Sequence, residues 1–537
     1  MILKEHELLQ IDEKFISQLR EQDPDALAGL SIKLVTDLKE VLERLNQNPS
    51  NSSRPSGSLA PWDKGGADED DELNIDEKEA LQSKTNTDKE KPSDTGDTKD
   101  DGPASEKPKG TNESRKPGRQ PDSQGFGRIQ KLANTDTKHH HCEYCSACNT
   151  DMSSIEKAYT GFQTVNVEFG NTDSPGLSLT VILHLYYQGL CSKCGLENRT
   201  EPLRATADTL DWKNVGMTEW RLIGPDLAAL IVYLSMDMRV TRRKVKQFLE
   251  DVLGLELSIG TIQNCIVESA RALSPVEKQL LDDLCNESLI HADETSHNEA
   301  GARLWLWVFV SSRTALFLIG HRTDEIFVNV FDALIGFTGH LMTDGYGVYR
   351  TFLLRLRCWA HLLRKARGLS ECYTSASQRL GQQVEAIMND LVAAVYQARE
   401  GPDGGAVSIL SRHQEALENL RKVCVAMSDS SHKKTRELGR EFLNDWDAIF
   451  RVLEYPAWPL TNNDAERALR NWVILRKITQ GTRSDQGSRA LALFASVFVT
   501  CRLRNRSPLL YIRDVINMRR QGSDVPKLPQ VLAVGAA

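Results

Sequence analysis

Three acidic residues, far apart in the sequence, have the chemistry of a site for divalent metal ions. Asp293 ends the short apolar run 289–293, Asp344 ends the run 339–344, and Glu466 follows Pro459 in a segment with helical pattern. In-line displacement at phosphorus requires charge to be neutralised on both the attacking and the leaving oxygen, which two divalent ions about 4 Å apart provide. Mg²⁺ or Mn²⁺ needs hard oxygen ligands on rigid elements. The three acids are therefore candidate catalytic residues and ligands for two such ions.

The segments between these acids predict how they are positioned. Strands are expected over 289–293, 304–310 and 315–319, followed by a helix over 325–334 and a fourth strand over 339–345. Three strands, a helix and a fourth strand, with acids at the ends of the first and fourth, is the order of an RNase H-like fold. If these strands lie side by side, Asp293 and Asp344 project toward one point. Glu466 is then expected on a helix that packs beside the sheet.

Each acid also has a structural interpretation that requires no catalysis. Asn463 and Glu466 have the spacing of a helix N-cap and its capping-box glutamate. Asp344 and Gly345 fit a simple turn, and an aspartate at a strand end is commonly a hydrogen-bonded surface group. The catalytic interpretation rests on the three acids occurring together in this order.

The cysteines predict a second metal site, of a different kind. Two pairs, Cys145/Cys148 and Cys191/Cys194, have the spacing of a tetrahedral zinc site, in which four thiolates bind one structural Zn²⁺. Cys145 and Cys148 are preferred to Cys142 because Asn149 follows Cys148 as Gly195 follows Cys194. Asn and Gly both tolerate the left-handed backbone that a metal-binding turn often needs. The alternating segment 179–185 between the pairs predicts a strand, as in a zinc ribbon.

Other interpretations of the cysteine-rich segment stay open at this stage. The thiols could form disulfides or be unpaired and buried, and Cys142 or a histidine of 139–141 could replace one of the four ligands. Cys358 and His361 also resemble a metal pair, but two ligands are too few for a closed zinc site. We expect those two residues to serve packing or hydrogen bonding where a fifth strand enters a helix.

Basic residues indicate where nucleic acid would bind. The segment 225–273 predicts helices interrupted at Gly254, with Ser258 as an N-cap, which is the outline of a helix-turn-helix or of a plain helical hairpin. The chain carries a net charge of −8, yet its end is basic. The candidate DNA-binding residues are Arg242, Arg243, Lys244, Arg467, Arg470, Arg476 and Lys477. A solvated face, or Arg467 balancing Glu466, would explain some of these residues equally well.

Five segments resemble the signature blocks of the insertion-sequence-66 family of DDE transposases. These are His291–Thr295, Trp305–Trp307, Met342–Tyr346, Cys358–His361 and Leu460–Arg470. The cysteine pairs and the helices after Pro225 are similar to that family's zinc-finger and helical DNA-binding regions, so the resemblance covers about 142–516. It implies that Asp293, Asp344 and Glu466 are the metal-binding triad. The segment 478–483 departs from the more aromatic stretch of many members, and so do the first 130 residues.

Composition limits the class of protein. The chain has 537 residues, 40% of them hydrophobic and 26% charged, and its apolar runs are too short for a membrane helix. We expect a multidomain α+β protein whose RNase H-like mixed-sheet catalytic core is interrupted by an all-α insertion. The expected order is N-terminal helices 1–50, a disordered acidic linker 51–130, a zinc ribbon 131–215, a helical DNA-binding region 216–283, the first core part 284–367, the insertion 368–458, and the last core part with a basic tail 459–537.

The resemblance implies a DNA transposase that hydrolyses a phosphodiester bond at transposon ends and joins the freed 3′-hydroxyl to target DNA. Its expected partners are double-stranded DNA and further copies of the chain, with accessory transposition proteins left open. No membrane is expected, and the location would be cytoplasmic, at the nucleoid. The alternatives are an RNase H-like structure-specific nuclease and a zinc-containing DNA-binding regulator with an idle core.

Overall fold

The structure is a computed structural model that describes residues 11–45, 130–152, 157–170, 173, 176–201, 222–334 and 336–531. The predicted linker 51–130, apart from Gln130, lies outside these residues. The first elements are helices α2 (Glu13–Gln22) and α3 (Pro24–Leu45), where the sequence predicts amphipathic helices. No helix in the described part of the chain is long and apolar enough to cross a membrane.

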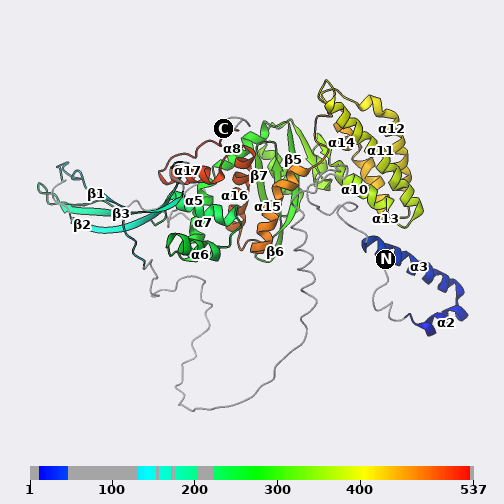
Figure 1. Ribbon diagram of the computed structural model, residues 1–537, viewed down its shortest axis with the longest axis horizontal. Helices are drawn as coiled ribbons and strands as arrows, with labels where there is room; N and C mark the ends of the chain where they lie inside the picture. Colours follow the sequence, from blue (N-terminus) through cyan, green and yellow to red (C-terminus); the bar gives the residue numbers. More distant parts are fainter. Residues whose placement is uncertain are drawn as a thin grey trace, which may run out of the picture. The chain divides into compact units, whose positions relative to one another are not determined.

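A four-stranded sheet carries the cysteine-rich segment (Figure 1). Its strands run in the order β1-β3-β2, and β4 also pairs with β3. The predicted strand 179–185 is the middle of β3, whereas β1 and β2 were not predicted. Many side chains of those two strands are partly or fully exposed, so their sequences lack a clear alternation of apolar and polar residues. The strands are β1 (Asp136–His140), β2 (Lys157–Phe169), β3 (Leu177–Leu190) and β4 (Glu197–Arg199).

The next segment is helical, as the sequence predicts, and its helix ends are set by local capping. Thr241 accepts from the backbone N–H of Lys244, and Ser258 from that of Thr261, while Gly254 ends the intervening helix with a φ of 61°. These caps produce the helix-turn-helix outline. The helices are α5 (Pro225–Met236), α6 (Arg242–Leu253), α7 (Ile259–Leu273) and α8 (Val276–Cys285).

A five-stranded mixed sheet follows, in the order β7-β6-β5-β8-β9. Strands β5, β6 and β7 are antiparallel, whereas β8 pairs parallel to β5 and β9 pairs parallel to β8. The strands are β5 (Leu289–Glu299), β6 (Ala302–Val310), β7 (Ala315–Gly320), β8 (His340–Thr343) and β9 (Arg355–Arg357), with α9 (Asp324–Ala333) and the 3₁₀ helix η2 (Gly347–Thr351) between them.

Strand β5 is longer than the sequence predicts. The expected strand ended at Asp293, but the structure continues it to Glu299 because β6 pairs with β5 as far as Ala302. Residues 293–299 are mostly polar and lack the alternation of a half-buried strand, so the sequence did not predict this extension. Asp293 therefore lies inside β5 rather than at its end.

Both faces of the sheet are covered, which explains the nearly continuous apolar sequence of β6. Leu306, Val308 and Val310 belong to one hydrophobic cluster, which also contains residues of α15 (Asn463–Thr479) and α16 (Asp485–Leu503). Trp307 and Phe309 belong to a second cluster with α9. Figure 1 shows α16 beside β7. Because side chains alternate along a strand, burial on both faces requires apolar residues at every position.

The segment between β9 and α15 is helical, as predicted. Its hydrophobic cluster includes Met342 of β8 and Leu356 of β9, so these helices share a core with one edge of the sheet. The elements are α10 (Trp359–Ser370), α11 (Ser375–Glu400), η3 (Leu410–His413), α12 (Gln414–Ser428), α13 (Lys433–Asn444), α14 (Trp446–Phe450) and η4 (Arg451–Leu453).

The C-terminal helices share a core with the helical region that precedes the sheet. Residues of α5, α7, α16 and α17 (Pro508–Arg520) belong to one hydrophobic cluster. Several basic residues of the C-terminal segment form ion pairs across this contact. The pairs are Arg489–Glu277, Arg502–Asp237 and Arg504–Asp283.

Gly481 provides a test of how the loop between α15 and α16 is held against β5. Its φ is +92°, and a Cβ there would lie 2.0 Å from the carbonyl oxygen of Asn298. We expect Gly481→Ala to lower the free energy of unfolding by about 2–4 kcal/mol, since the left-handed backbone and the overpacking each carry a cost. Gly522→Ala is the control, because its φ is +74° and no atom lies within 4 Å of its Cβ position. Equal losses in chemical denaturation would contradict this account.

Candidate functional site

The register of the parallel pair β5–β8 places two of the candidate acids side by side. Leu289 pairs with His340 and His291 with Met342, so two further residues along each chain bring Asp293 level with Asp344. Asp293 also lies on the same face of the sheet as His291, since side chains alternate along a strand. His291 lies 3.1 Å from Asn462, the residue that precedes α15. Both aspartates are partly buried.

Backbone hydrogen bonds fix one oxygen of each aspartate. The N–H of Glu294 donates to Asp293 Oδ1 at 2.8 Å, and the N–H of Tyr346 donates to Asp344 Oδ1 at 3.0 Å. Asp344 thus does close a turn, as its structural interpretation predicted. The second oxygen of each carboxylate accepts no hydrogen bond from the residues that the structure describes.

Glu466 lies in the first turn of α15, and the capping-box interpretation of it is wrong. The helix begins at Asn463, so Asn462 and not Asn463 is the N-cap, and it makes no side-chain capping bond. The Asn462 amide instead donates to the carbonyl oxygen of Ala292 at 2.9 Å, which ties the start of α15 to β5. Glu466 Oε1 lies 3.8 Å from His361 Nε2.

The three carboxylates interact electrostatically. Burial raises the pKa of Asp293 well above its usual value, and the negative charges of Asp344, Glu294 and Glu466 raise it further. Burial also raises the pKa of Glu466, and Asp344 adds to the effect, although Arg364 opposes it. Like charges that disfavour the ionisation of Asp293 and Glu466 indicate a site where a cation would be stabilised.

The donor set fits divalent cations that prefer oxygen. Three carboxylates on rigid elements, partly accessible to solvent, are the ligands that Mg²⁺ and Mn²⁺ prefer. The three acids do not come as close together as the cysteines: in the described part of the chain, only Cys145, Cys148, Cys191 and Cys194 form a group of potential ligands with all donor atoms within 4.8 Å of one another.

Cys358 and His361 join α10 to the start of α15. The Cys358 sulfur accepts from the N–H of Asn462 at 3.3 Å and lies 3.2 Å from His361 Nδ1. Burial lowers the pKa of His361 to about 4, so its imidazole is neutral near pH 7 and does not neutralise Glu466. The two residues thus serve hydrogen bonding and packing beside the site, rather than forming a metal pair.

Glu294 is a fourth carboxylate that sequence reasoning missed. It accepts from Tyr349 Oη at 2.6 Å and from the Arg322 guanidinium at 2.6 and 3.0 Å, and burial raises its pKa to about 7. The Arg322 guanidinium also stacks on Trp305 and Tyr346. The adjacent acids in Asp293-Glu294 were the available signal, but the sequence does not reveal which partners they contact.

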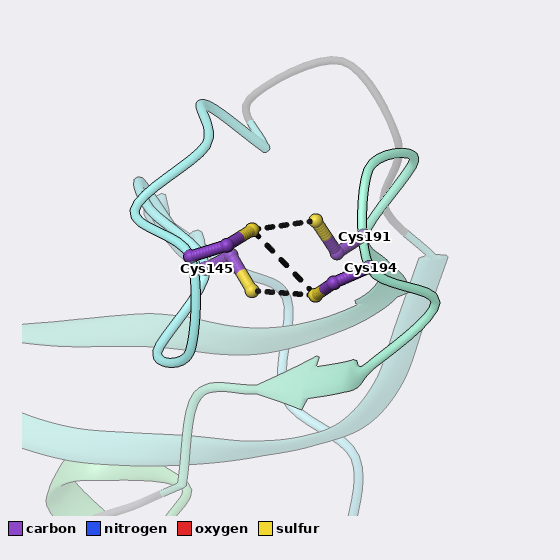
Figure 2. A group of neighbouring side chains, drawn as sticks. Cys145, Cys191 and Cys194 are labelled. Atoms are coloured by element: carbon purple, nitrogen blue, oxygen red, sulfur yellow. Dashed lines mark hydrogen bonds between the residues drawn. The ribbon is translucent and has the colours of Figure 1, made fainter.

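The four cysteines predicted to bind zinc lie together at one end of the first sheet. Figure 2 shows Cys145 facing Cys191 and Cys194 across the site, and the sulfurs of Cys145 and Cys194 lie 3.5 Å apart. Cys148 lies 3.4 Å from Cys191 and 3.5 Å from Cys194. A tetrahedral ion with Zn–S bonds of about 2.3 Å separates its sulfurs by roughly 3.8 Å. The four cysteines could therefore bind a zinc ion.

Two equivalent turns hold these cysteines. The backbone carbonyl oxygen of Cys145 accepts from the N–H of Asn149 at 2.9 Å, and that of Cys191 accepts from the N–H of Gly195 at 2.8 Å. Asn149 and Gly195 have φ values of 54° and 70°. Cys145 and Cys148 were chosen because a left-handed residue was expected after each cysteine pair. That backbone conformation is present after both pairs.

The thiols of the cluster influence one another's protonation. Hydrogen bonds from the backbone N–H groups of Cys148 and Ala147 lower the pKa of Cys145 to about 6. The neighbouring sulfurs of Cys145 and Cys148 raise the pKa of Cys194 to about 12, against the effect of a backbone hydrogen bond at Leu196. A site that gathers several thiols in this way favours a bound cation, because thiolates are the ligands that such an ion binds.

The alternative ligands lie outside this group. The thiol of Cys142 contacts the carbonyl oxygen of Tyr187 at 3.9 Å, and His139 and His140 contact Tyr187 and His184. The eleven cysteines all lie in the described part of the chain and none of them forms a disulfide there, which contradicts the disulfide interpretation.

The candidate DNA-binding residues have different surroundings. Arg242, Arg243 and Lys244 are exposed on α6, and Arg467 and Lys477 are exposed on α15, whereas Arg470 and Arg476 are half-buried. Arg467 pairs with Asp464 at 3.7 Å rather than with Glu466. Arg476 donates to the hydroxyls of Thr295 and Ser296 at 3.2 Å, beside β5.

Comparison with known proteins identifies the family. A family model described as the transposase IS66 family matches residues 221–490, half of the chain, so the chain belongs to this family. Three uncharacterized proteins of Sinorhizobium fredii are also similar. One, y4qI, is 29% identical over half of this chain and 54% of its own length, and another, y4hP, is 23% identical over 55% of this chain and 59% of its own. The chain thus spans little more than half the length of these relatives. Family membership supports a transposase role.

The zinc assignment can be tested by metal content. We expect Cys148→Ser to reduce bound zinc from about one ion per chain to nearly none, because three thiolates do not close a structural site. Cys142→Ser is the matched control and should retain the ion, since Cys142 lies outside the cluster. Elemental analysis of both purified variants decides the matter, and the opposite pattern would make Cys142 the ligand.

Proposed function

We propose that this chain is a DDE transposase that cleaves DNA at transposon ends and transfers the freed strand into target DNA. The observation that carries the proposal is that Asp293 lies level with Asp344 across the β5–β8 pair and that the charges of both Asp344 and Glu466 act on it. This supports a common metal site on the mixed sheet β7-β6-β5-β8-β9, which we interpret as an RNase H-like core. Membership of the transposase family supports the same conclusion.

In this proposal the three carboxylates hold two Mg²⁺ or Mn²⁺ ions. Such ions would activate the attacking oxygen and stabilise the leaving oxygen of an in-line displacement. The chain contributes rigid positioning: β5 and β8 hold the two aspartates in register, and Asn462 fixes the start of the helix that carries Glu466. The same residues serve water attack in the first step and attack by the 3′-hydroxyl in the second, without a covalent bond between protein and DNA.

The basic residues would hold the DNA backbone. Exposed Arg242, Arg243 and Lys244 on α6 would contact phosphates beside a helix-turn-helix, with Arg467, Arg470, Arg476 and Lys477 acting nearer the triad. The zinc-binding segment would serve as a second DNA-binding part. Paired transposon ends imply at least two copies of the chain during the reaction, with accessory proteins left open.

Glu466→Gln tests the triad. We expect a folded protein that binds DNA normally but cleaves it at least about 100-fold more slowly, because several kcal/mol of transition-state stabilisation are lost. Gel-based cleavage of transposon-end DNA in Mg²⁺, with binding measured separately in Ca²⁺, provides the readout. Glu385→Gln, which changes a carboxylate that contacts Arg367 and Ser370 and none of the three acids, is the control and should cleave like the unmodified chain. Unchanged cleavage in Glu466→Gln would remove Glu466 from the site.

The reaction products distinguish the proposal from its two alternatives. A transposase joins the cut 3′ end to a target plasmid, whereas a structure-specific nuclease leaves nicks and no joined product. A regulator with an idle core would bind the DNA and change neither strand.

A further inference from the structure

The helices between β9 and α15 are tied to the sheet by a cluster of charged residues that is buried at its centre, which we call the arginine clamp. It consists of Arg350, Arg355 and Arg357 on the sheet side, and of Asp445 and Glu441 on the helical side. Asp445, between α13 and α14, has a fully buried side chain and accepts hydrogen bonds from all three arginines. Glu441 of α13 also pairs with Lys365 of α10 at 2.8 Å.

Arg357 connects this clamp to the turn after β8. Its side chain is fully buried, and its Nη1 donates to Asp445. Its Nη2 donates to Glu441 Oε1 at 2.5 Å and to the carbonyl oxygen of Asp344 at 3.1 Å. A Cβ on Gly345 would lie 2.1 Å from the same Nη2. The guanidinium thus lies directly against the backbone of Asp344 and Gly345.

Attaching a helical segment to a sheet does not require buried charges such as those of the clamp. Burial alone would raise the pKa of Asp445 and of Glu441, yet the neighbouring cations lower both, so the two acids are ionised. Desolvating such charges is costly, and apolar packing at the same place would stabilise the fold at least as well. The three arginines and Lys365 outnumber the two acids, which leaves a net positive charge beside Asp344.

We propose that the helical segment positions Asp344 through the arginine clamp, with Arg357 as the positioning residue. This inference rests on the proposed function, in which Asp344 is a metal ligand. Arg357 contacts the main chain of Asp344 and leaves its carboxylate to the metal. The N–H of Tyr346, in the same turn, donates to Asp344 Oδ1. Arg357 holds the backbone of this turn at Asp344 and Gly345, and the turn sets the direction of the Asp344 carboxylate.

Glu441→Gln is the primary test. It weakens the ion pair with Arg357, but glutamine has nearly the same volume as glutamate, and Arg357 keeps its contact with Asp445. Loss of a partner outside the metal ligands commonly costs about 10–100-fold in metal affinity. We expect about tenfold weaker Mn²⁺ binding, measured by electron paramagnetic resonance, and faster hydrogen exchange of the amides of residues 344–348. In cleavage assays the half-saturating Mg²⁺ concentration should rise by a similar factor, while the affinity for DNA stays unchanged.

The matched control is Glu385→Gln. Glu385 accepts from Arg367 Nε at 2.9 Å and from Ser370 Oγ at 3.1 Å, so it forms a comparable ion pair between α10 and α11 without contacting Arg357. Its removal should leave Mn²⁺ affinity and exchange at 344–348 as in the unmodified chain. Equal shifts in both variants would mean general loosening of the helices and would overturn the proposal.

A second variant keeps the test decisive. Asp445→Asn should produce larger shifts of the same kind, with circular dichroism showing that the helices remain folded. Unchanged exchange and Mn²⁺ affinity in both Glu441→Gln and a folded Asp445→Asn would overturn the clamp. If the unmodified chain binds Mn²⁺ no better than Glu466→Gln does, the proposed function fails, while hydrogen exchange still reports whether the clamp holds the turn.

Discussion

Repulsion among carboxylates is the constraint on which the rest of the structure depends. Asp293, Asp344, Glu294 and Glu466 lie close enough for their charges to oppose one another, so flexible segments would let them separate. The protein holds them with rigid elements. A parallel strand pair sets two of the aspartates level, a helix tied to β5 through Asn462 carries Glu466, and Arg322 with Tyr349 compensates Glu294. Charge clusters of this kind are concentrated at functional sites, because folding alone gains nothing from them.

Much of this arrangement could be predicted from the sequence because it depends on local chemistry. The apolar strands, the caps at Ser258 and Gly254, and the helices after β9 all follow from short-range patterns. The choice of cysteines followed from the backbone freedom of Asn149 and Gly195. The family resemblance assigns the three acids to one site, which periodicity alone would not have done, and this assignment stays a prediction.

The features that could not be predicted depend on contacts distant in the sequence. The extension of β5 to Glu299 depends on pairing with β6, and a run of polar residues conceals it. The charges of Arg355, Arg357 and Asp445 read as solvated surface in a sequence, yet the fold buries them together. Arg489, Arg502 and Arg504 contribute to the basic charge of the end of the chain, and the structure pairs each of them with an acid. Whether a charged side chain is buried depends on its having an oppositely charged partner, and the spacing of residues in the sequence does not reveal that partner.

The position of α15 near the end of the chain has a consequence for biosynthesis. Glu466 is separated from Asp344 by the whole helical segment, whereas the cysteine cluster and helices α5–α8 come before the sheet. Because a nascent polypeptide emerges from the ribosome starting at its N-terminus, the cysteine cluster and α6, two of the parts proposed to contact DNA, are made before the last acid exists. A chain interrupted during translation would therefore carry those parts without the complete set of carboxylates.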